Sequence, residues 1–406
     1  MKTLIKQQGF VLLLFVTVLA TAAATVTVKA LNHASQNSQL VRDKITAAAL
    51  AQAKDALIGR AVSDANRPGS LPCPDMVTNV SNNVPNDGIA DLLQGNDCPS
   101  YIGRLPWKTL DLPDLRDGSG ERLWYVLSRN FRDDNSAQPI NSDLKGTLTV
   151  YASDGSTPMT PPGSEAVAVI FAPGAVLATQ NRGNTKVNDA TQYLEQFNCP
   201  GPNCRNNAVA AGPFIAGPIL DASRNPLLNN KLLVIRARDI MPAIEKLVAK
   251  QLNNWLQTYY ATNGYYPYPA KYNACDDENC QGDNTTCRGR IPILAASGTA
   301  AWSPPPWFVN NQWYREIYYS VGSTSLKSPA SVTCLPTLTV GTGAVRAVFF
   351  MPGTPIGSIT RPSVRISDYL EDPENQDGWS GLGIANDLYV VPSSTTLDRD
   401  RLYSFP

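Results

Sequence analysis

The residues of this chain best suited to chemistry are eight cysteines and a small group of aspartates. The cysteines are Cys73, Cys98, Cys199, Cys204, Cys275, Cys280, Cys287 and Cys334. An even number of cysteines in a protein that leaves the cytoplasm is typical of a disulfide framework. Closeness in sequence favours the pairs Cys73–Cys98 and Cys199–Cys204 and leaves the other four to pair within the second half. The alternative is zinc, because the four-residue gaps after Cys199 and Cys275 approach zinc-ligand spacing.

The aspartates lie in a turn-rich stretch between the first two cysteines. They are Asp75, Asp87 and Asp91. Carboxylate oxygens clustered in a loop can bind calcium, although this spacing does not match the EF-hand pattern. Asp and Asn are also the usual residues of turns. Calcium is therefore the one candidate cofactor, and a plain turn without a metal is the alternative.

An enzyme is not predicted. The single histidine, His33, comes soon after an apolar N-terminal run, so no histidine is available further along for a Ser–His or Cys–His arrangement. Neither a phosphate-binding glycine loop nor a G-x-S-x-G motif occurs. The 34 basic and 34 acidic residues balance, which gives no net attraction towards nucleic acid. An exported hydrolase that uses two carboxylates is a remaining, less favoured class.

The N-terminal stretch must place these residues relative to a membrane. Residues Phe10–Val28 carry no charge, and nineteen residues in a helix cover about 28 Å, roughly one hydrocarbon core. Lys2 and Lys6 precede the run, so the positive-inside rule predicts a single transmembrane helix with the rest of the chain outside. A cleaved signal peptide and a plain signal anchor are the alternatives.

Helical periodicity continues beyond this run. Apolar residues recur every four positions at Val41, Ile45, Ala49, Ala53, Leu57 and Ala61, which predicts an amphipathic helix over residues 30–62. A second helix is predicted from Asp239, as N-cap, to Asn263. Runs rich in β-branched and aromatic residues predict strands at Arg122–Ser128, Gly146–Tyr151, Glu165–Ala172 and Lys231–Arg236.

The second half repeats the first in order, which indicates an internal duplication of an α+β unit. For example, Cys98 and Gly103-Arg-Leu-Pro106 correspond to Cys287 and Gly289-Arg-Ile-Pro292. The remaining matches join residues 123–128 to 315–320, 167–174 to 345–353, 189–195 to 368–371 and 230–235 to 386–391, with a proline-rich stretch after each helix.

The N-terminal junction resembles that of type IV pilins and type II secretion pseudopilins. A basic leader, Gly9, Phe10 and an unbroken apolar run are the residues that carry the resemblance. It implies cleavage after Gly9 and methylation of Phe10 by a prepilin peptidase. The family's major subunits have a glutamate at the fifth mature position, where this chain has Leu14. In lacking this glutamate, the chain resembles the minor subunits at a filament tip.

The resemblance implies an α+β fold in which a transmembrane helix continues into a pilin-like helix packed on an antiparallel sheet, duplicated as two tandem pilin-like domains. The predicted segments are a leader at 1–9, a transmembrane helix at 10–28 and domains at 29–238 and 239–406. The implied partners are other pilins or pseudopilins, the prepilin peptidase and a bacterial inner membrane, crossed once, with the domains in the periplasm or on a surface filament. The alternative function is an anchored protein that binds a ligand or partner and never polymerises.

Overall fold

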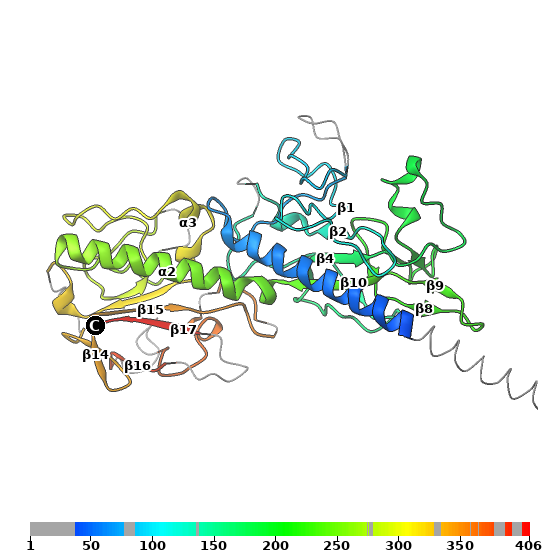
Figure 1. Cartoon of the computed structure of the whole chain (residues 1–406). Coiled ribbons are helices and arrows are strands. Elements are labelled where there is room, and N and C mark those ends of the chain that lie inside the picture. Colours follow the sequence, from blue (N-terminus) through cyan, green and yellow to red (C-terminus); the bar gives the residue numbers. More distant parts are fainter. Residues whose placement is uncertain are drawn as a thin grey trace, which may run out of the picture.

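The structure is a computed structural model. It describes residues 37–76, 86–134, 138–273, 275, 279–328, 334–357, 359–363, 365–376, 386–391 and 400–406. The described chain forms two lobes that lie side by side (Figure 1). We call residues 37–236 the first lobe and residues 237–406 the second lobe.

The first lobe contains the N-terminal helix, described over residues 37–63, and a four-stranded antiparallel sheet. The sheet has the order β1 (Ile102–Arg104), β2 (Trp124–Leu127), β4 (Ala166–Ala172) and β10 (Lys231–Arg236). Every side chain of β2 and β4 is buried. Such continuous apolar runs require a covering layer on each face of the sheet.

The second lobe begins without a linker, because α2 (Ala237–Asn263) starts at the residue that follows β10. Asp239 is the third helical residue rather than the predicted N-cap, and its carboxylate accepts the backbone N–H of Arg236 at 2.9 Å. Gly264, in the left-handed conformation, ends the helix. The sheet of this lobe has the order β11 (Arg288–Arg290), β12 (Tyr318–Val321), β15 (Ala347–Met351) and β17 (Arg401–Phe405).

Smaller elements lie in the long loops. Three strands form one further sheet, namely β14 (Gly343–Val345), β13 (Leu338–Val340) and β16 (Leu388–Tyr389). Two-stranded pairs are β3 (Val150–Tyr151) with β7 (Phe214–Ile215), β5 (Gln196–Phe197) with β6 (Arg205–Asn206), and β8 (Ile219–Leu220) with β9 (Pro226–Leu228). The short helices are α3 (Pro306–Asn310) and the 3-10 turns Arg129–Phe131, Asn184–Lys186, Ala190–Gln192, Trp313–Arg315, Ser323–Ser325 and Ile366–Asp368.

One hydrophobic core runs through both lobes. It joins the inner faces of the N-terminal helix and α2 to one face of each four-stranded sheet. The opposite face of each sheet has its own core, which the loops cover; Trp124 and Phe171 belong to the first of these and Tyr318 and Phe350 to the second. The sheets are therefore buried on both sides.

The predicted fold class is wrong. The described residues hold three α-helices, and their strands are divided among six sheets of two to four strands rather than a helix-on-sheet pilin fold with an N-terminal transmembrane helix. The physical reason lies in the loops, whose apolar residues build extra strands and separate cores on the second face of each four-stranded sheet.

The predicted localisation, a single-pass inner-membrane protein, is contradicted as well. No helix among the described residues is long and apolar enough to cross a membrane. The predicted leader at 1–9 and transmembrane helix at Phe10–Val28 lie outside the described residues. The disulfides reported below are consistent with an oxidising compartment.

Candidate functional site

The N-terminal helix buries apolar side chains against the body of the protein only from Ala49 onwards, although Thr46 is also buried. Ala49, Ala53, Leu57 and Ala61 are buried, as the periodicity predicts. Val41 and Ile45 occupy the same predicted face, yet they are 56% and 47% exposed, and Leu40 is 58% exposed. The first described turns thus present three large aliphatic side chains to the surroundings.

Two polar contacts hold this exposed start of the helix. The hydroxyl of Thr46 accepts the backbone N–H of Gly118 at 3.0 Å and donates to the carbonyl of Arg42 at 2.9 Å. Gly118 lies so close that a Cβ atom there would be 2.2 Å from the Arg42 carbonyl oxygen. On the neighbouring strand β10, the amine of Lys231 donates to Asp43 at 2.6 Å. The helix is therefore fixed in direction although its first apolar side chains are uncovered.

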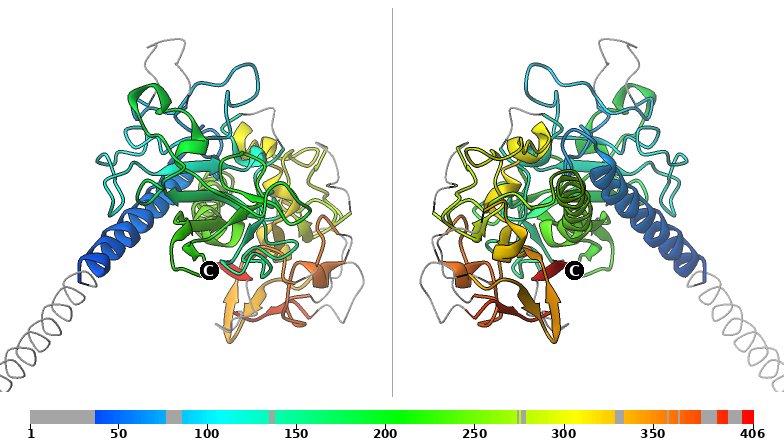
Figure 2. Two further views of the ribbon diagram at one scale, coloured as in Figure 1. Left: turned by 90° about the vertical axis from the view of Figure 1, so that its right-hand side faces the viewer. Right: turned by 90° about the vertical axis from the view of Figure 1, so that its left-hand side faces the viewer.

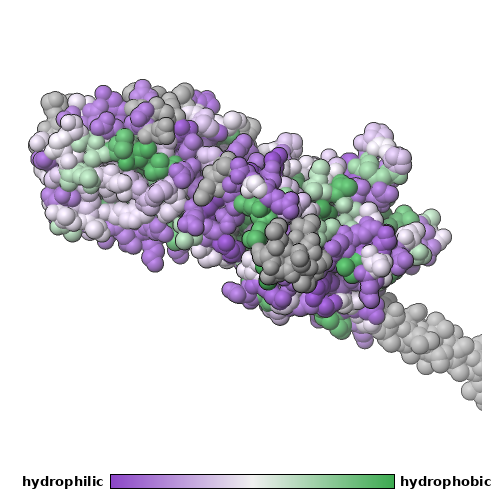
Figure 3. Space-filling view, turned by 90° about the horizontal axis from the view of Figure 1, so that it is seen from above, coloured by the Kyte–Doolittle hydropathy of each residue, from purple (hydrophilic) through white to green (hydrophobic). Residues whose placement is uncertain are grey.

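The helix leaves the body on the side away from the second lobe. In both views of Figure 2 the first described turns of the blue helix extend to one side, and the second lobe lies on the other. On the face seen in Figure 3, hydrophobic residues form small separate patches among hydrophilic ones. Because Leu40, Val41 and Ile45 are three exposed aliphatic residues close together on one helix, we take the first described turns of the helix as the candidate assembly surface.

Each lobe also contains a buried cluster of arginine and aromatic side chains. In the first lobe the guanidinium of Arg104 lies 4.3 Å from the ring centre of Trp124 and 4.0 Å from that of Tyr193. Arg182 lies 4.9 Å from the Tyr193 ring and donates to the carbonyl of Gly174 at 2.8 Å. Its Nη1 is 3.1 Å from a carboxylate oxygen of Glu121. We call these residues the first arginine cluster.

The second lobe repeats this cluster at equivalent positions. Arg290 lies 4.2 Å from the ring centre of Tyr318 and 4.8 Å from that of Tyr369. Arg361 lies 4.9 Å from the Tyr369 ring and donates to the carbonyl of Gly353 at 2.7 Å. Its Nη1 is 3.6 Å from a carboxylate oxygen of Glu316. These residues form the second arginine cluster.

Backbone pairing shows that the clusters are equivalent. Arg104 pairs with Trp124 across β1 and β2, and Arg290 pairs with Tyr318 across β11 and β12. Gly174 and Gly353 both have positive φ, and each precedes its arginine by eight residues. The sequence matches had aligned the tyrosines but had not identified either pair of arginines as a site.

One carboxylate of the first lobe enters the second cluster. Asp143 lies 3.3 Å from Nε of Arg361, and its side chain hydrogen-bonds that of Glu316. Burial raises the pKa of the Asp143 carboxyl above its ordinary value. Burial, together with the charge of Asp143, raises the pKa of Glu316 well above its ordinary value. The two carboxyls are therefore expected to keep protons to a higher pH than exposed carboxyls do.

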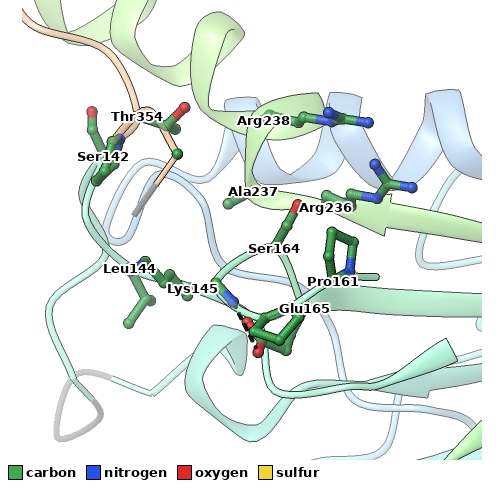
Figure 4. Close-up of a pocket in the computed structure, with 14 residues that line it drawn as sticks. Ser142, Leu144, Lys145, Pro161, Ser164, Glu165, Arg236, Ala237, Arg238 and Thr354 are labelled. Atoms are coloured by element: carbon green, nitrogen blue, oxygen red, sulfur yellow. Dashed lines mark hydrogen bonds between the residues drawn. The ribbon is translucent and has the colours of Figure 1, made fainter. Parts of the chain in front are cut away.

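A polar cavity of about 370 Å³ lies next to this junction, between the lobes (Figure 4). It is lined by the loop before β4, by the start of α2 and by the second-lobe loop that follows β15. The residues labelled in Figure 4 include Ser142, Lys145, Glu165, Arg236, Arg238 and Thr354. Arg236, one of the cations in this lining, already donates to the carbonyl of Met159 at 2.7 Å.

The predicted calcium residues have structural roles in the described loop. Asp75 is 2% exposed, and its two oxygens accept the backbone N–H groups of Asn86 and Gly88 at 2.9 and 2.7 Å. Asp91 accepts the N–H of Met76 at 3.2 Å, and Asp87 accepts that of Ile89 at 2.8 Å. Burial raises the pKa of Asp75 to about 6, although the two N–H groups lower it. No group of three or more potential metal ligands occurs in the part of the chain that the structure describes.

All eight cysteines form disulfides, and none is free. The predicted pairs Cys73–Cys98 and Cys199–Cys204 are confirmed. The other four cysteines pair within the second half as Cys275–Cys280 and Cys287–Cys334. The zinc alternative is therefore wrong, because each sulfur is already bonded to another.

One predicted match of the duplication is misplaced. In the first lobe Glu195 donates its N–H to the side chain of Asn230 and accepts the N–H of Asn230, at 2.8 and 3.1 Å. In the second lobe Glu371 makes the same reciprocal pair with Asp400, at 2.8 and 3.2 Å. Asp400 precedes β17 as Asn230 precedes β10, so residues 400–405, not 386–391, correspond to residues 230–235.

A catalytic arrangement is not found among the described residues. The buried carboxyls Glu195, Asp143 and Glu316 are each held by N–H groups, guanidinium or another carboxyl. His33 and the predicted processing residues Gly9 and Phe10 lie outside the described residues. No protein-family model matches the chain, and no curated protein or solved structure shows significant similarity to it.

Proposed function

We propose that this protein is a minor structural subunit of a filament of the type IV pilin and pseudopilin class, joined to its neighbours through the N-terminal helix. The observation that carries the proposal is the exposure of Leu40, Val41 and Ile45 on a helix that is fixed in direction. Burying such side chains against other helices gains roughly 25 cal/mol for each Å² of apolar surface. An exposed aliphatic start is expected of a helix that packs with others.

Two further features support this function. The chain that precedes the helix carries the Gly9–Phe10 junction and an uncharged run, which fit prepilin processing and helical packing. Each lobe contains two of the four disulfides, which suits a subunit outside the cytoplasm. Because the second lobe lies on the side opposite the helix start, we place the subunit at a filament end, where nothing needs to stack on that lobe.

The deciding experiment is the intact mass of the protein from cells with and without a co-expressed prepilin peptidase. We expect loss of residues 1–9 and the gain of one methyl group on Phe10. A Gly9→Val variant, expressed at the same level, should remain unprocessed. An unchanged N-terminus, in cells that process a control pilin correctly, would contradict the proposal.

A second experiment tests the interface itself. A photo-crosslinking residue at Ile45 should form adducts with another filament subunit. The matched control is the same residue at Asp55, which is exposed on the same helix but beside the body of the lobe. Equal crosslinking at the two positions would show that the exposed aliphatic turns are not the contact surface.

A further inference from the structure

The two arginine clusters differ in their charge balance. In the second cluster, two guanidinium groups, Arg290 and Arg361, face two carboxyls, Glu316 and Asp143. Asp143 is supplied by the other lobe. The second cluster therefore obtains part of its counter-charge from a neighbouring folded unit.

Among the described residues, the first cluster has no ion pair with a carboxylate from the other lobe. Glu121 pairs with Arg182, and Asp114 binds Arg116 at 2.7 Å and Arg122 at 2.9 Å. With Arg104, these three guanidinium groups and two carboxylates make four cations against two anions. Among the described residues, no carboxylate lies within 4.0 Å of Arg104, whose bonds go to the carbonyls of Arg122 and Val187 at 3.2 and 3.1 Å.

The pKa values of the two buried arginines Arg104 and Arg290 shift in opposite directions. Arg104 is 6% exposed, and desolvation lowers its pKa to about 10. Arg290 is equally buried, yet its pKa is raised, because neighbouring tyrosines and Glu316 outweigh the effect of burial. The charge of Glu121 acts on Arg104 without forming a direct ion pair among the described residues. A buried cation that lacks a direct ion pair gains most from a carboxylate that arrives with a ligand.

A cavity gives such a ligand access to the first cluster. It has a volume of about 360 Å³ and is lined by Asn86, Arg104, Arg116, Glu121, Arg122, Val187 and Tyr193. Three of these residues, Arg104, Glu121 and Tyr193, are cluster members. None of the residues 77–85, which adjoin Asn86 outside the described part of the chain, is acidic.

We propose that this cavity is a docking site for a carboxylate side chain on a loop of another protein subunit, equivalent to the entry of Asp143 into the second arginine cluster. The partner presents an Asp or Glu on an exposed loop, and guanidinium groups bind it by charge-assisted hydrogen bonds. The proposal does not depend on polymerisation through the N-terminal helix, because the purified chain alone contains the cavity.

The test uses a peptide with the sequence of residues Pro139–Thr147, the segment that carries Asp143, and a twin with Asn at that position. Calorimetric titration of the full chain should give an affinity about tenfold higher for the Asp peptide than for its twin. Arg116→Gln, at the exposed rim of the cavity, should remove most of that difference. Arg129→Gln, an exposed ion-paired arginine elsewhere in the same lobe, should leave it unchanged.

Sodium acetate separates the two sources of a carboxylate. We expect the peptide to bind more tightly than acetate and to be displaced by it only at high concentration. Equal affinities of the Asp and Asn peptides, or an unchanged preference in both Arg116→Gln and Arg104→Lys, would overturn the site. Binding of acetate without binding of the peptide would overturn the assignment to a polypeptide partner. Arg104→Lys is an independent test of the same cavity, with folding checked by circular dichroism. This variant should weaken binding of the Asp peptide.

Discussion

Individual buried residues in this protein are held by partners distant in sequence, and their protonation is coupled to folding. Glu195 is the clearest case, because two backbone N–H groups and the amide of Gln180 surround its carboxyl. Burial nevertheless dominates and raises its pKa to about 7. A carboxyl whose pKa is raised in the folded state stabilises the fold when protonated, and that contribution is lost as the pH rises through the folded pKa.

We therefore expect the contribution of Glu195 to the free energy of unfolding to decrease as the pH rises from about 4.5 to about 8. Glu195→Gln cannot ionise, so the free energy of unfolding of this variant should decline less over that interval than that of the wild type. Urea denaturation at several pH values measures the difference. Parallel pH profiles of the two proteins would show that Glu195 has an ordinary pKa.

A second prediction concerns the glycine beside each arginine cluster. A Cβ atom at Gly289 would lie 1.7 Å from the backbone oxygen of Ala270, and one at Gly103 would lie 2.9 Å from that of Asp75. Gly289→Ala should cost about 2–4 kcal/mol of stability, since the paired backbone must move apart. Gly103→Ala should cost less, and thermal unfolding ranks the two. A stable Gly289→Ala protein would mean that this backbone contact is looser than described.

At the scale of elements, the sequence predicted what local pattern determines and missed what depends on distant contacts. The strand predicted at Lys231–Arg236 is β10, and Glu165–Ala172 contains β4, because β-branched residues recur in both. The match of residues 230–235 with 386–391 failed because both contain a Leu followed by β-branched or aromatic residues, whereas the true equivalence rests on Glu371 bonding Asp400. The arginine clusters left two usable signals in the sequence. One is the match of Gly103-Arg-Leu-Pro106 with Gly289-Arg-Ile-Pro292, and the other is an arginine eight residues after each Pro-Gly pair at Gly174 and Gly353.

The start of the N-terminal helix provides a prediction at this scale. Gly118→Ala would place a Cβ atom against the Arg42 carbonyl and should detach the first turns from the loop. Hydrogen exchange should quicken in residues 42–50 and stay unchanged in the second lobe. The control is Gly59→Ala. An added Cβ there would have no atom of another element within 4 Å, so this variant should stabilise the helix by about 0.5–1 kcal/mol. Faster exchange in the control, or none in Gly118→Ala, would contradict the contact.

The disulfides allow another prediction. Cys287–Cys334 closes a separation of 47 residues, and Cys199–Cys204 closes one of 5. Loop entropy assigns about 4 kcal/mol to the longer closure and about 2 kcal/mol to the shorter. Double serine variants should therefore differ by about 2 kcal/mol in stability, as measured by chemical denaturation. Equal losses would indicate that unfolded-chain entropy does not govern these bonds.

For the whole molecule, the junction of the lobes is held by charge as well as by the common core. Arg361 is almost fully buried between Asp143 of one lobe and Glu316 of the other. The backbone N–H of Ile140 also donates to the side chain of Asn311 across the junction, at 2.9 Å. The lobes are thus expected to unfold together.

Arg361→Gln should destabilise the protein by about 3–5 kcal/mol, because it removes the cation that is ion-paired with both buried carboxyls. The loss should be smaller at acid pH, where both carboxyls are protonated. Arg129→Gln, which breaks an exposed pair with Asp97, should cost far less stability, because solvent screens that pair. Calorimetry across pH distinguishes these expectations from a pH-independent loss, which would exclude a role for the carboxyls.

The direct continuation of β10 into α2 has a mechanical consequence. Six residues of β10 are paired with β4 up to the point where the helix begins, so the connection has no slack. A load applied to the second lobe would reach the first as torque on that strand, and a swivel would require breaking the strand pairing or the first helical turn. The molecule should therefore behave as a stiff body that transmits tension and bending between the second lobe and the N-terminal helix.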